Sequence, residues 1–212
     1  MGIGVLGGTF DPIHRGHLEL AQAALVQLQL DEIVFMPAGE PWLKSGYRVT
    51  PASYRLAMVC LVVKDNPAFQ VSAMEINRQG PTYTVETLEA LHEDYGEGIH
   101  LLVGMDILNQ FQRWKNPDRI LELCRLTVAK RAGWDETAIH KFQETFPKAV
   151  DKIDLLETEL PDIGSTELRG RIARGDNVKG EVATPVMDYI CLLYTSDAAD
   201  DTPCVDLGGR RI

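Results

Sequence analysis

Apolar and polar positions along the chain fall into blocks that predict strands and helices in alternation. Residues 3–6 form a short apolar run, which is typical of a strand buried on both faces. Leu18, Ala21, Leu25 and Leu28 then recur at helical spacing and predict an amphipathic helix. Because this alternation continues through residue 174, we expect an α/β fold with a single doubly wound parallel sheet.

The later blocks predict the remaining elements of this domain. Residues 37–44 contain two prolines and a glycine and are expected to form a loop, whereas residues 74–77 are expected to be extended. Thr50 is expected to cap a helix that has Pro51 at its first position. Further strands are predicted at residues 32–36, 69–71, 99–103, 126–129 and 153–156, and helices at residues 50–63, 84–95, 117–123, 135–146 and from residue 185.

The stretch that joins the first strand to the first helix, residues 7–17, carries the clearest chemistry. Gly7 and Gly8 allow the backbone to approach a ligand closely, and the free N–H groups at a helix start bind phosphate. His14 and His17 are three positions apart and therefore lie on one face of the helix start. A single histidine is more often structural, but two at this spacing behind a Gly-Gly-Thr turn favour a polyphosphate site.

Composition and charge narrow the class of protein. The chain has 212 residues, of which 45% are hydrophobic and 25% charged, as in an ordinary globular domain. Its net charge of −10 argues against a nucleic-acid partner, which calls for a basic surface. No apolar run approaches the ~20 residues of a membrane span and no signal peptide opens the chain, so we expect a cytoplasmic protein without a membrane partner. The four cysteines lack metal-ligand spacing.

Residues 7–17 resemble the GTFDPxHxGH signature of the nucleotidyltransferases related to class I tRNA synthetases. The resemblance implies a Rossmann-like nucleotidyltransferase fold. It also implies that His14 and His17 hold the phosphates of ATP and offset the charge that develops at the α-phosphate during catalysis. The rest of the stretch is implied to bind ATP through Gly7, Gly8, Thr9 and Phe10.

A second phosphate element is expected at residues 163–169, which resemble the I-S-S-T-x-x-R element of the same family. Ser165 is expected to be the N-cap of a helix, and Arg169 lies about one turn inside it. The resemblance implies that Ser165, Thr166 and Arg169 hold the β- and γ-phosphates. Gly164 stands where the family usually has a first serine, so we expect weakened phosphate binding.

Two further positions follow predicted strand ends, where ligands gather in open α/β sheets. Lys44 lies in the loop after the second strand, either as a solvated lysine or, as the resemblance implies, as a catalytic phosphate contact. Gly104 and Asp106 resemble the family's G-x-D element, which implies a place in the ATP site with Asp106 accepting hydrogen bonds from ribose. Asp106 could instead cap the short helix that follows.

The acceptor substrate is indicated by residues 80–88, which resemble the (S/P)-x-Y-T-x-x-T-L element of nicotinate mononucleotide adenylyltransferases. Thr84 is expected to cap the helix that starts here, and the resemblance implies that Thr82, Tyr83 and Thr84 receive the pyridine substrate. Trp114 lies in a segment that resembles the family's F-x-x-W element, where its ring is either structural or stacks on a flat ligand.

Together these resemblances imply transfer of the adenylyl group of ATP to nicotinate mononucleotide, giving deamido-NAD and pyrophosphate. Mg²⁺ is expected to arrive with ATP, without a dedicated metal site on the protein. One alternative is phosphopantetheine adenylyltransferase, which shares both phosphate elements. Another is a nucleotide-binding protein with little turnover, limited by Gly164 and an altered C-terminus. The sequence leaves open whether the chain forms a homo-oligomer.

The last 22 residues, 191–212, differ in character from the rest. Read back into codons, residues 191–200 resemble a transposase end sequence used in DNA library preparation, and residues 204–212 resemble a translated sequencing adapter. The nucleotidyltransferase domain is therefore expected to span residues 1–190, with its C-terminal helix truncated. Residues 191–212 are expected to be a non-native, disordered tail, because they carry few large apolar side chains.

Overall fold

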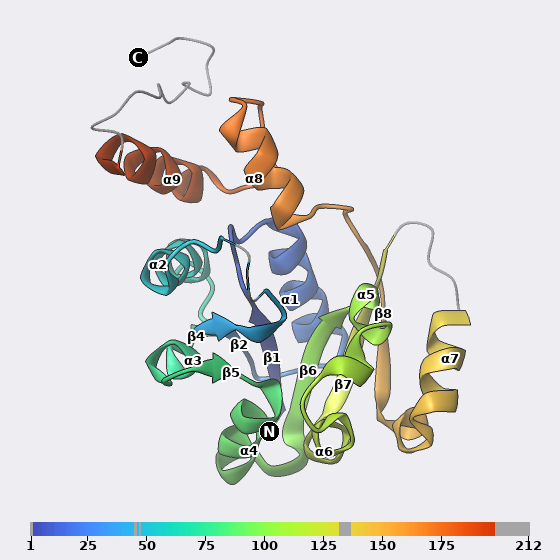
Figure 1. Ribbon diagram of the computed structural model, residues 1–212. Coiled ribbons are helices and arrows are strands. Elements are labelled where there is room, and N and C mark those ends of the chain that lie inside the picture. The colour runs from blue at the N-terminus through green and yellow to red at the C-terminus, as the bar shows by residue number, and fades with distance from the viewer. Residues whose placement is uncertain (1, 45, 47, 132–136, 198–212) are drawn as a thin grey trace.

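A computed structural model describes residues 2–44, 46, 48–131 and 137–197 (Figure 1). Its centre is a six-stranded parallel sheet with the strand order β4-β2-β1-β6-β7-β8. This order confirms the predicted doubly wound sheet, and it reverses direction between β1 and β6, where such sheets bind ligands. The strands are β1 (Ile3–Gly8), β2 (Glu32–Pro37), β4 (Phe69–Val71), β6 (Ile99–Gly104), β7 (Arg125–Arg131) and β8 (Ile153–Leu160).

Helices cover both faces of this sheet (Figure 1). The alternation of side chains along each strand divides the core in two: Leu6 and Phe35 enter one buried cluster, whereas Val5 and Val34 enter the other. The first cluster is covered by α1 (Arg15–Gln27), α2 (Ala52–Val63), α8 (Ser165–Ala173) and α9 (Thr184–Asp197). The second is covered by α4 (Thr84–Tyr95), α5 (Met105–Leu108), α6 (Pro117–Leu123) and α7 (Thr137–Thr145).

Two short segments differ from the predictions. Met74–Asn77 forms the helix α3 rather than an extended segment, and the predicted loop at residues 37–44 contains β3 (Glu40–Pro41). Strand β3 pairs with β5 (Pro81–Thr82) in a second, two-stranded parallel sheet. Close packing explains both errors, because a Cβ on Gly39 would collide with the carbonyl oxygen of Glu75. Elements this short owe their form to such contacts and carry no periodic signal.

Three helix caps lie one residue away from the predicted position, one of them after it and two before it. The N-caps of α2, α4 and α8 are Pro51, Tyr83 and Gly164, so the caps predicted at Thr50, Thr84 and Ser165 are wrong. Tertiary contacts explain two of these shifts. The Ser165 hydroxyl donates to the carbonyl of Pro12 at 3.1 Å, and the carbonyl of Thr50 accepts from a buried arginine.

The C-terminal helix also departs from the prediction. Helix α9 continues through Asp197, so residues 191–197 are helical and the expected disorder is wrong for them. Its packing explains the continuation, because Ile190 is buried against the core and Leu193, three positions later, lines a cavity with Met58 of α2. Residues 198–212 lie outside the described part of the chain, so the expectation for them stays a prediction.

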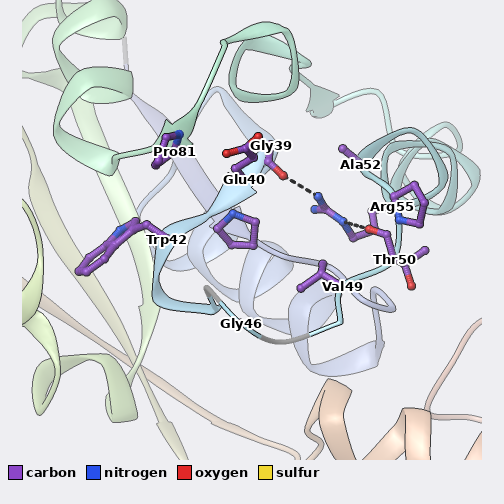
Figure 2. A pocket seen from close by; sticks show the side chains of 11 residues that line it. Gly39, Glu40, Trp42, Gly46, Val49, Thr50, Ala52, Arg55 and Pro81 are labelled. Atoms are coloured by element: carbon purple, nitrogen blue, oxygen red, sulfur yellow. Dashed lines mark hydrogen bonds between the residues drawn. The ribbon is translucent and has the colours of Figure 1, made fainter.

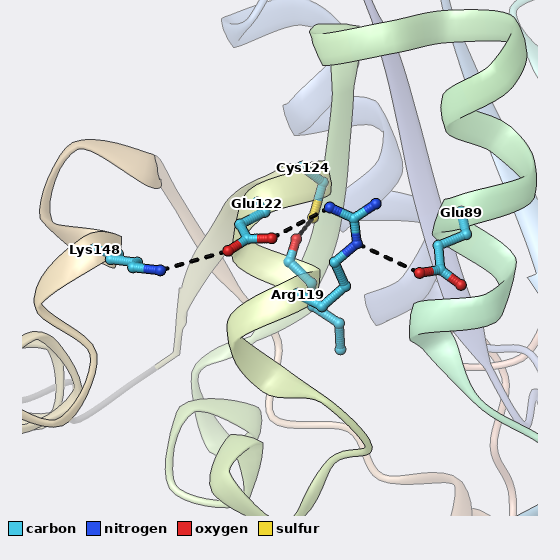
Figure 3. A network of polar contacts seen from close by, with 6 residues as sticks. Glu89, Arg119, Glu122, Cys124 and Lys148 are labelled. Carbon is cyan, nitrogen blue, oxygen red and sulfur yellow. Dashed lines mark hydrogen bonds and ion pairs between the residues drawn. The ribbon is translucent and has the colours of Figure 1, made fainter.

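On the surface of the protein, ion pairs join helix α6 to its neighbours (Figure 3). Arg119 contacts Glu89 of α4 at 3.4 Å and Glu122 at 3.2 Å, and Lys148 contacts Glu122 at 3.4 Å. Such exposed pairs add little stability. The buried Cys124 lies behind them, and burial raises the pKa of its thiol to about 12. None of the helices in the described residues has both the length and the apolar character that a membrane crossing requires.

Candidate active site

A cavity of about 450 Å³ opens at the carboxyl ends of β1 and β6, where the strand order reverses. It brings together residues that are far apart in the sequence and that the motifs predict as site residues. These are Gly7, Gly8, Thr9, His17, Thr82, Thr84, Asp106 and Trp114. The sheet topology therefore gathers residues 7–17, here called the histidine loop, with the start of α4 and the segment after β6 around one space.

The two histidines of the loop occupy different environments. His14 is the N-cap of α1 and is only 5% exposed, whereas His17 borders the cavity. Their rings stack with centroids 3.7 Å apart. The backbone N–H of His14 donates to Nδ1 of His17 at 3.2 Å. Because Nδ1 accepts this bond, the proton of the neutral ring lies on Nε2, so His17 has an N–H donor on its other nitrogen.

Phe10 packs against the His17 ring of the histidine loop and is not among the residues that line the cavity. It is 1% exposed, and its ring meets the His17 ring edge-on at 5.0 Å. Its φ of 50° lies in the left-handed region, which a bulky residue adopts only when its surroundings hold it there. A Cβ on Gly8 would lie 3.1 Å from this ring, while one on Gly7 would meet no atom of the protein within 4 Å. Gly8 thus gives space to Phe10, and Gly7 borders open space.

The start of α8 is bonded to the outer side of the histidine loop. The Ser165 hydroxyl donates to the Pro12 carbonyl, and Nη1 of Arg169 donates to the Asp11 carbonyl at 2.6 Å. Nη2 of Arg169 donates to the Thr166 hydroxyl at 3.4 Å. The second predicted phosphate element therefore meets the first through the backbone of residues 11 and 12.

Asp106 lies at the end of β6, beside the histidine loop. Gly104, and not Asp106, is the N-cap of α5, so Asp106 falls in the first helical turn. A Cβ on Gly104 would lie 2.6 Å from Oδ1 of Asp106, so only glycine allows the carboxylate to pack there. The carboxylate borders the cavity, where it can accept hydrogen bonds from hydroxyl groups.

The predicted acceptor residues divide between the cavity and its supports. Thr84 and Trp114 border the cavity, and the indole Nε1 of Trp114 is buried with no hydrogen-bond partner among the described residues. The Thr82 hydroxyl is already used, because it donates to the carbonyl of Glu40 at 3.2 Å. The Tyr83 ring packs against Trp42 at 5.9 Å, with Nζ of Lys115 4.2 Å from its centroid. Tyr83 thus supports Trp42, a cavity residue that no motif indicates.

Lys44 ends a short 3-10 turn, Trp42–Lys44. Its side chain lies outside the described part of the structure, so its phosphate contact stays a prediction.

Glu75 is a further cavity residue that sequence reasoning misses. It is 8% exposed and its Oε1 accepts a hydrogen bond from the Thr87 hydroxyl at 2.7 Å, while Nη1 of Arg78 donates to that hydroxyl at 3.2 Å. Burial raises the pKa of Glu75, and the bond from Thr87 and the charge of Arg78 oppose that rise. The available signal is a carboxylate between two apolar residues, Met74 and Ile76, which is uncommon on a solvated face.

Comparison with known sequences adds three findings. The sequence profile of the Cytidylyltransferase-like family matches residues 5–171. A protein of Roseiflexus sp. (strain RS-1), named "Probable nicotinate-nucleotide adenylyltransferase", is 43% identical over 188 residues, which cover 89% of this chain and 94% of that protein. A protein of Thermomicrobium roseum with the same name is 39% identical over 189 residues, covering 89% of this chain and 88% of that protein.

Among solved structures, the chain is similar to the Plasmodium falciparum nicotinic acid mononucleotide adenylyltransferase complexed with NaAD. The TM-score is 0.71 at 19% identity, and the match covers 92% of this chain and 97% of that one. At this identity the likeness shows the fold alone.

Proposed function

The chain belongs to the cytidylyltransferase-like family, and from this membership we propose that it transfers the adenylyl group of ATP to nicotinate mononucleotide. The products are deamido-NAD and pyrophosphate. The near full-length match to relatives named nicotinate-nucleotide adenylyltransferase supports this acceptor. The observation that carries the proposal is one cavity that His17, Thr84 and Trp114 border together.

The chemistry needs positioning and charge stabilisation more than acid–base catalysis. The nucleophile is the phosphate of the mononucleotide, which is already anionic at neutral pH, so no residue has to remove a proton from it. His17 would donate from Nε2 toward the α-phosphate, where charge develops in the transition state. The bond from the His14 N–H to Nδ1 holds the ring in the tautomer that this donation requires.

The leaving pyrophosphate would be held by Lys44, by the start of α8 and by Arg169. In the structure, the hydroxyl of Ser165 and one arm of Arg169 bind loop carbonyls, and a guanidinium has further N–H groups for phosphate oxygens. Gly164 provides a backbone donor at this helix start but no hydroxyl, which supports weaker binding than a serine would give.

Mg²⁺ belongs to the proposal as a companion of ATP. Among residues 2–131 and 137–197, apart from positions 45 and 47, no group of three or more His, Cys, Asp or Glu side chains could hold a metal ion. We therefore assign Mg²⁺ to the triphosphate with most of its water shell, where it offsets phosphate charge. We propose the cytoplasm as the location of the reaction.

The end of the cavity around Thr84 and Trp114, here called the acceptor end, supports a preference for the acid over the amide mononucleotide. The first N–H groups of α4, after its N-cap Tyr83, have no partners within the helix and suit a carboxylate, which only accepts hydrogen bonds. An amide would turn its own N–H groups toward one of these donors. Polar mismatches of this kind discriminate by roughly 10⁴.

The proposal is tested by measuring pyrophosphate release with ATP and each of three acceptors. These are nicotinate mononucleotide, nicotinamide mononucleotide and phosphopantetheine, each assayed over a range of concentrations. We expect the highest kcat/KM with the nicotinate compound, and a value for nicotinamide mononucleotide that is lower by about 10⁴. Turnover with phosphopantetheine alone would replace the proposed acceptor. Tight ATP binding without turnover on any acceptor would indicate a binding protein.

A further inference from the structure

Arg55 is the largest fully buried side chain of the described residues, although it carries a charge. It lies on the first turn of α2 and is 1% exposed. Its guanidinium donates through Nε to the carbonyl of Thr50 at 2.8 Å, through Nη1 to that of Thr9 at 2.8 Å, and through Nη2 to that of Gly39 at 2.9 Å. Figure 2 shows the side chain pointing away from α2 toward Gly39 and Thr50.

The three accepting carbonyls belong to three separate segments around the cavity. Thr9 lies in the histidine loop and borders the cavity itself. Gly39 lies between β2 and β3, directly before the segment that brings Trp42 to the cavity wall. The backbone N–H of Thr50, in turn, donates to Oδ2 of Asp11 at 3.2 Å. One planar side chain thus links the end of the cavity around His17, here called the phosphate end, with the wall that leads to the acceptor end.

The electrostatics of Arg55 do not resemble those of an ordinary buried ion pair. Burial lowers its pKa and the charge of Asp11 raises it, yet the three hydrogen bonds described above all go to neutral carbonyl oxygens. A side chain that only filled this space would be better as an apolar residue, because a buried charge is costly to desolvate. A guanidinium, however, has donors in fixed directions in one plane, which sets the relative positions of the groups it binds.

We infer that Arg55 is a positioning residue for the proposed adenylyl transfer: it holds the histidine loop in register with the β2–β3 segment. The inference rests on the proposed function for its catalytic consequence and on the three bonds for its structural one. Reacting groups misplaced by about 1 Å lose roughly 10²-fold in rate. Loss of the three Arg55 hydrogen bonds therefore lowers kcat more than it weakens the binding of either substrate.

The test compares Arg55→Lys and Arg55→Met with Val59→Ala, which removes buried volume from the same helix. Val59 is 0% exposed and packs in the core, so its truncation costs stability without touching the three carbonyls. Arg55→Lys keeps the charge and part of the hydrogen bonding, so it is the variant that tests the inference if Arg55→Met does not fold. All variants are assayed at a temperature where circular dichroism shows them folded.

We expect both Arg55 variants to lose about 10²-fold in kcat, while KM for ATP and for nicotinate mononucleotide changes much less. We also expect faster amide hydrogen exchange in residues 7–17 and 38–42 than in the wild type. Val59→Ala should keep wild-type kcat, and its exchange in these segments should not change. Folded Arg55 variants with wild-type kcat and exchange, or an equal loss in Val59→Ala, would overturn the inference.

The two proposals fail separately. If the wild-type chain does not turn over any acceptor, the proposed function is wrong, and the exchange comparison alone still decides whether Arg55 holds the two segments together. If the wild type is active and the Arg55 variants match it, only the positioning role is wrong.

Discussion

The phosphate end of the cavity, around His17, and its acceptor end, around Thr84, are built from contacts of different range along the chain. At the phosphate end, Ser165 reaches Pro12 across 153 residues and Arg55 reaches Thr9 across 46. At the acceptor end, the Glu75–Thr87 bond spans 12 residues. The phosphate end thus depends on contacts that reach across most of the chain, whereas the acceptor-end contacts are shorter, the Thr82–Glu40 bond included, which spans 42 residues.

This difference determines how far the effect of a substitution should travel. A change in α2 or α8 reaches the phosphate end through single hydrogen bonds to loop carbonyls, even though those helices are remote in sequence. A change at Glu75 should stay at the acceptor end, because the Glu75–Thr87 and Arg78–Thr87 bonds both close within residues 75–87. Four substitutions test this contrast.

His17→Ala should have the largest effect and act on the phosphate end alone. Preorganised donors at developing charge contribute about 10²–10³ in rate, so we expect kcat to fall by that factor. The KM for nicotinate mononucleotide should change little. His140→Ala, on the exposed side of α7, is the matched control and should leave kcat unchanged. Near wild-type kcat in His17→Ala would mean that the histidine loop is structural.

Arg169→Ala should come next and show the long reach of the phosphate end. Hydrogen bonds to charged groups are worth about 1.5–3 kcal/mol, so KM for ATP should rise roughly 10- to 100-fold. Arg174→Ala, which removes a partner of Asp176 at the end of the same helix, is the control. Steady-state kinetics at saturating mononucleotide separate the two. Equal kinetics in both variants would remove Arg169 from the ATP site.

Glu75→Gln should change the acceptor end and leave ATP binding intact. Because burial raises the pKa of Glu75 above its usual value of 4.5, ionising this group in the folded state costs stability. Wild-type stability relative to Glu75→Gln should therefore be greatest below that value, fall as the pH rises through the raised pKa, and stay constant above it. Urea unfolding of both proteins across this pH range measures the difference. If the difference in stability between wild type and Glu75→Gln were the same at every pH, Glu75 would not be a buried carboxyl group with a raised pKa.

Gly164→Ser should have the smallest effect and strengthen the phosphate end. A Cβ at Gly164 would meet no atom within 4 Å, and its backbone is extended, so serine fits as an N-cap without strain. Serine exceeds glycine at this position by a few tenths of a kcal/mol, and we expect a slightly higher melting temperature with a lower KM for ATP. Gly39→Ala provides the contrast, since its Cβ would collide with the Glu75 carbonyl and should lower the melting temperature. An unchanged KM in Gly164→Ser would show that the missing hydroxyl is not limiting.

The sheet and the histidine loop are predictable because their signals are local and continuous. The apolar run at residues 99–103 predicts β6, which the structure extends by one residue to Gly104. The boundaries of α4 and α6 agree with the predicted residues 84–95 and 117–123, since each has a helical apolar pattern and a clear start. The loop at residues 7–17 combines a Gly-Gly-Thr turn with two histidines three positions apart in one short stretch.

What the sequence does not reveal depends on contacts between distant segments. Arg55 stands in the pattern of α2 as its one charged residue, and only the fold brings the carbonyls of Thr9 and Gly39 to it. Helix α3 and the pair of strands β3 and β5 are too short for any periodicity. Order in residues 191–197 comes from the packing of α9 on α2, which composition alone cannot show.

The reversal of strand order has a practical consequence for protein engineering. It divides the sheet at the β1–β6 pairing, where Ile3, Gly4 and Val5 meet Ile99, His100 and Leu101. A cut in the turn Gly96–Gly98 would leave His17 and Thr84 on one fragment and Asp106 and Trp114 on the other. Each fragment would hold half of the cavity and no complete site. Fused to two interacting proteins, such fragments would form a split enzyme whose pyrophosphate release reports that the two partners have met.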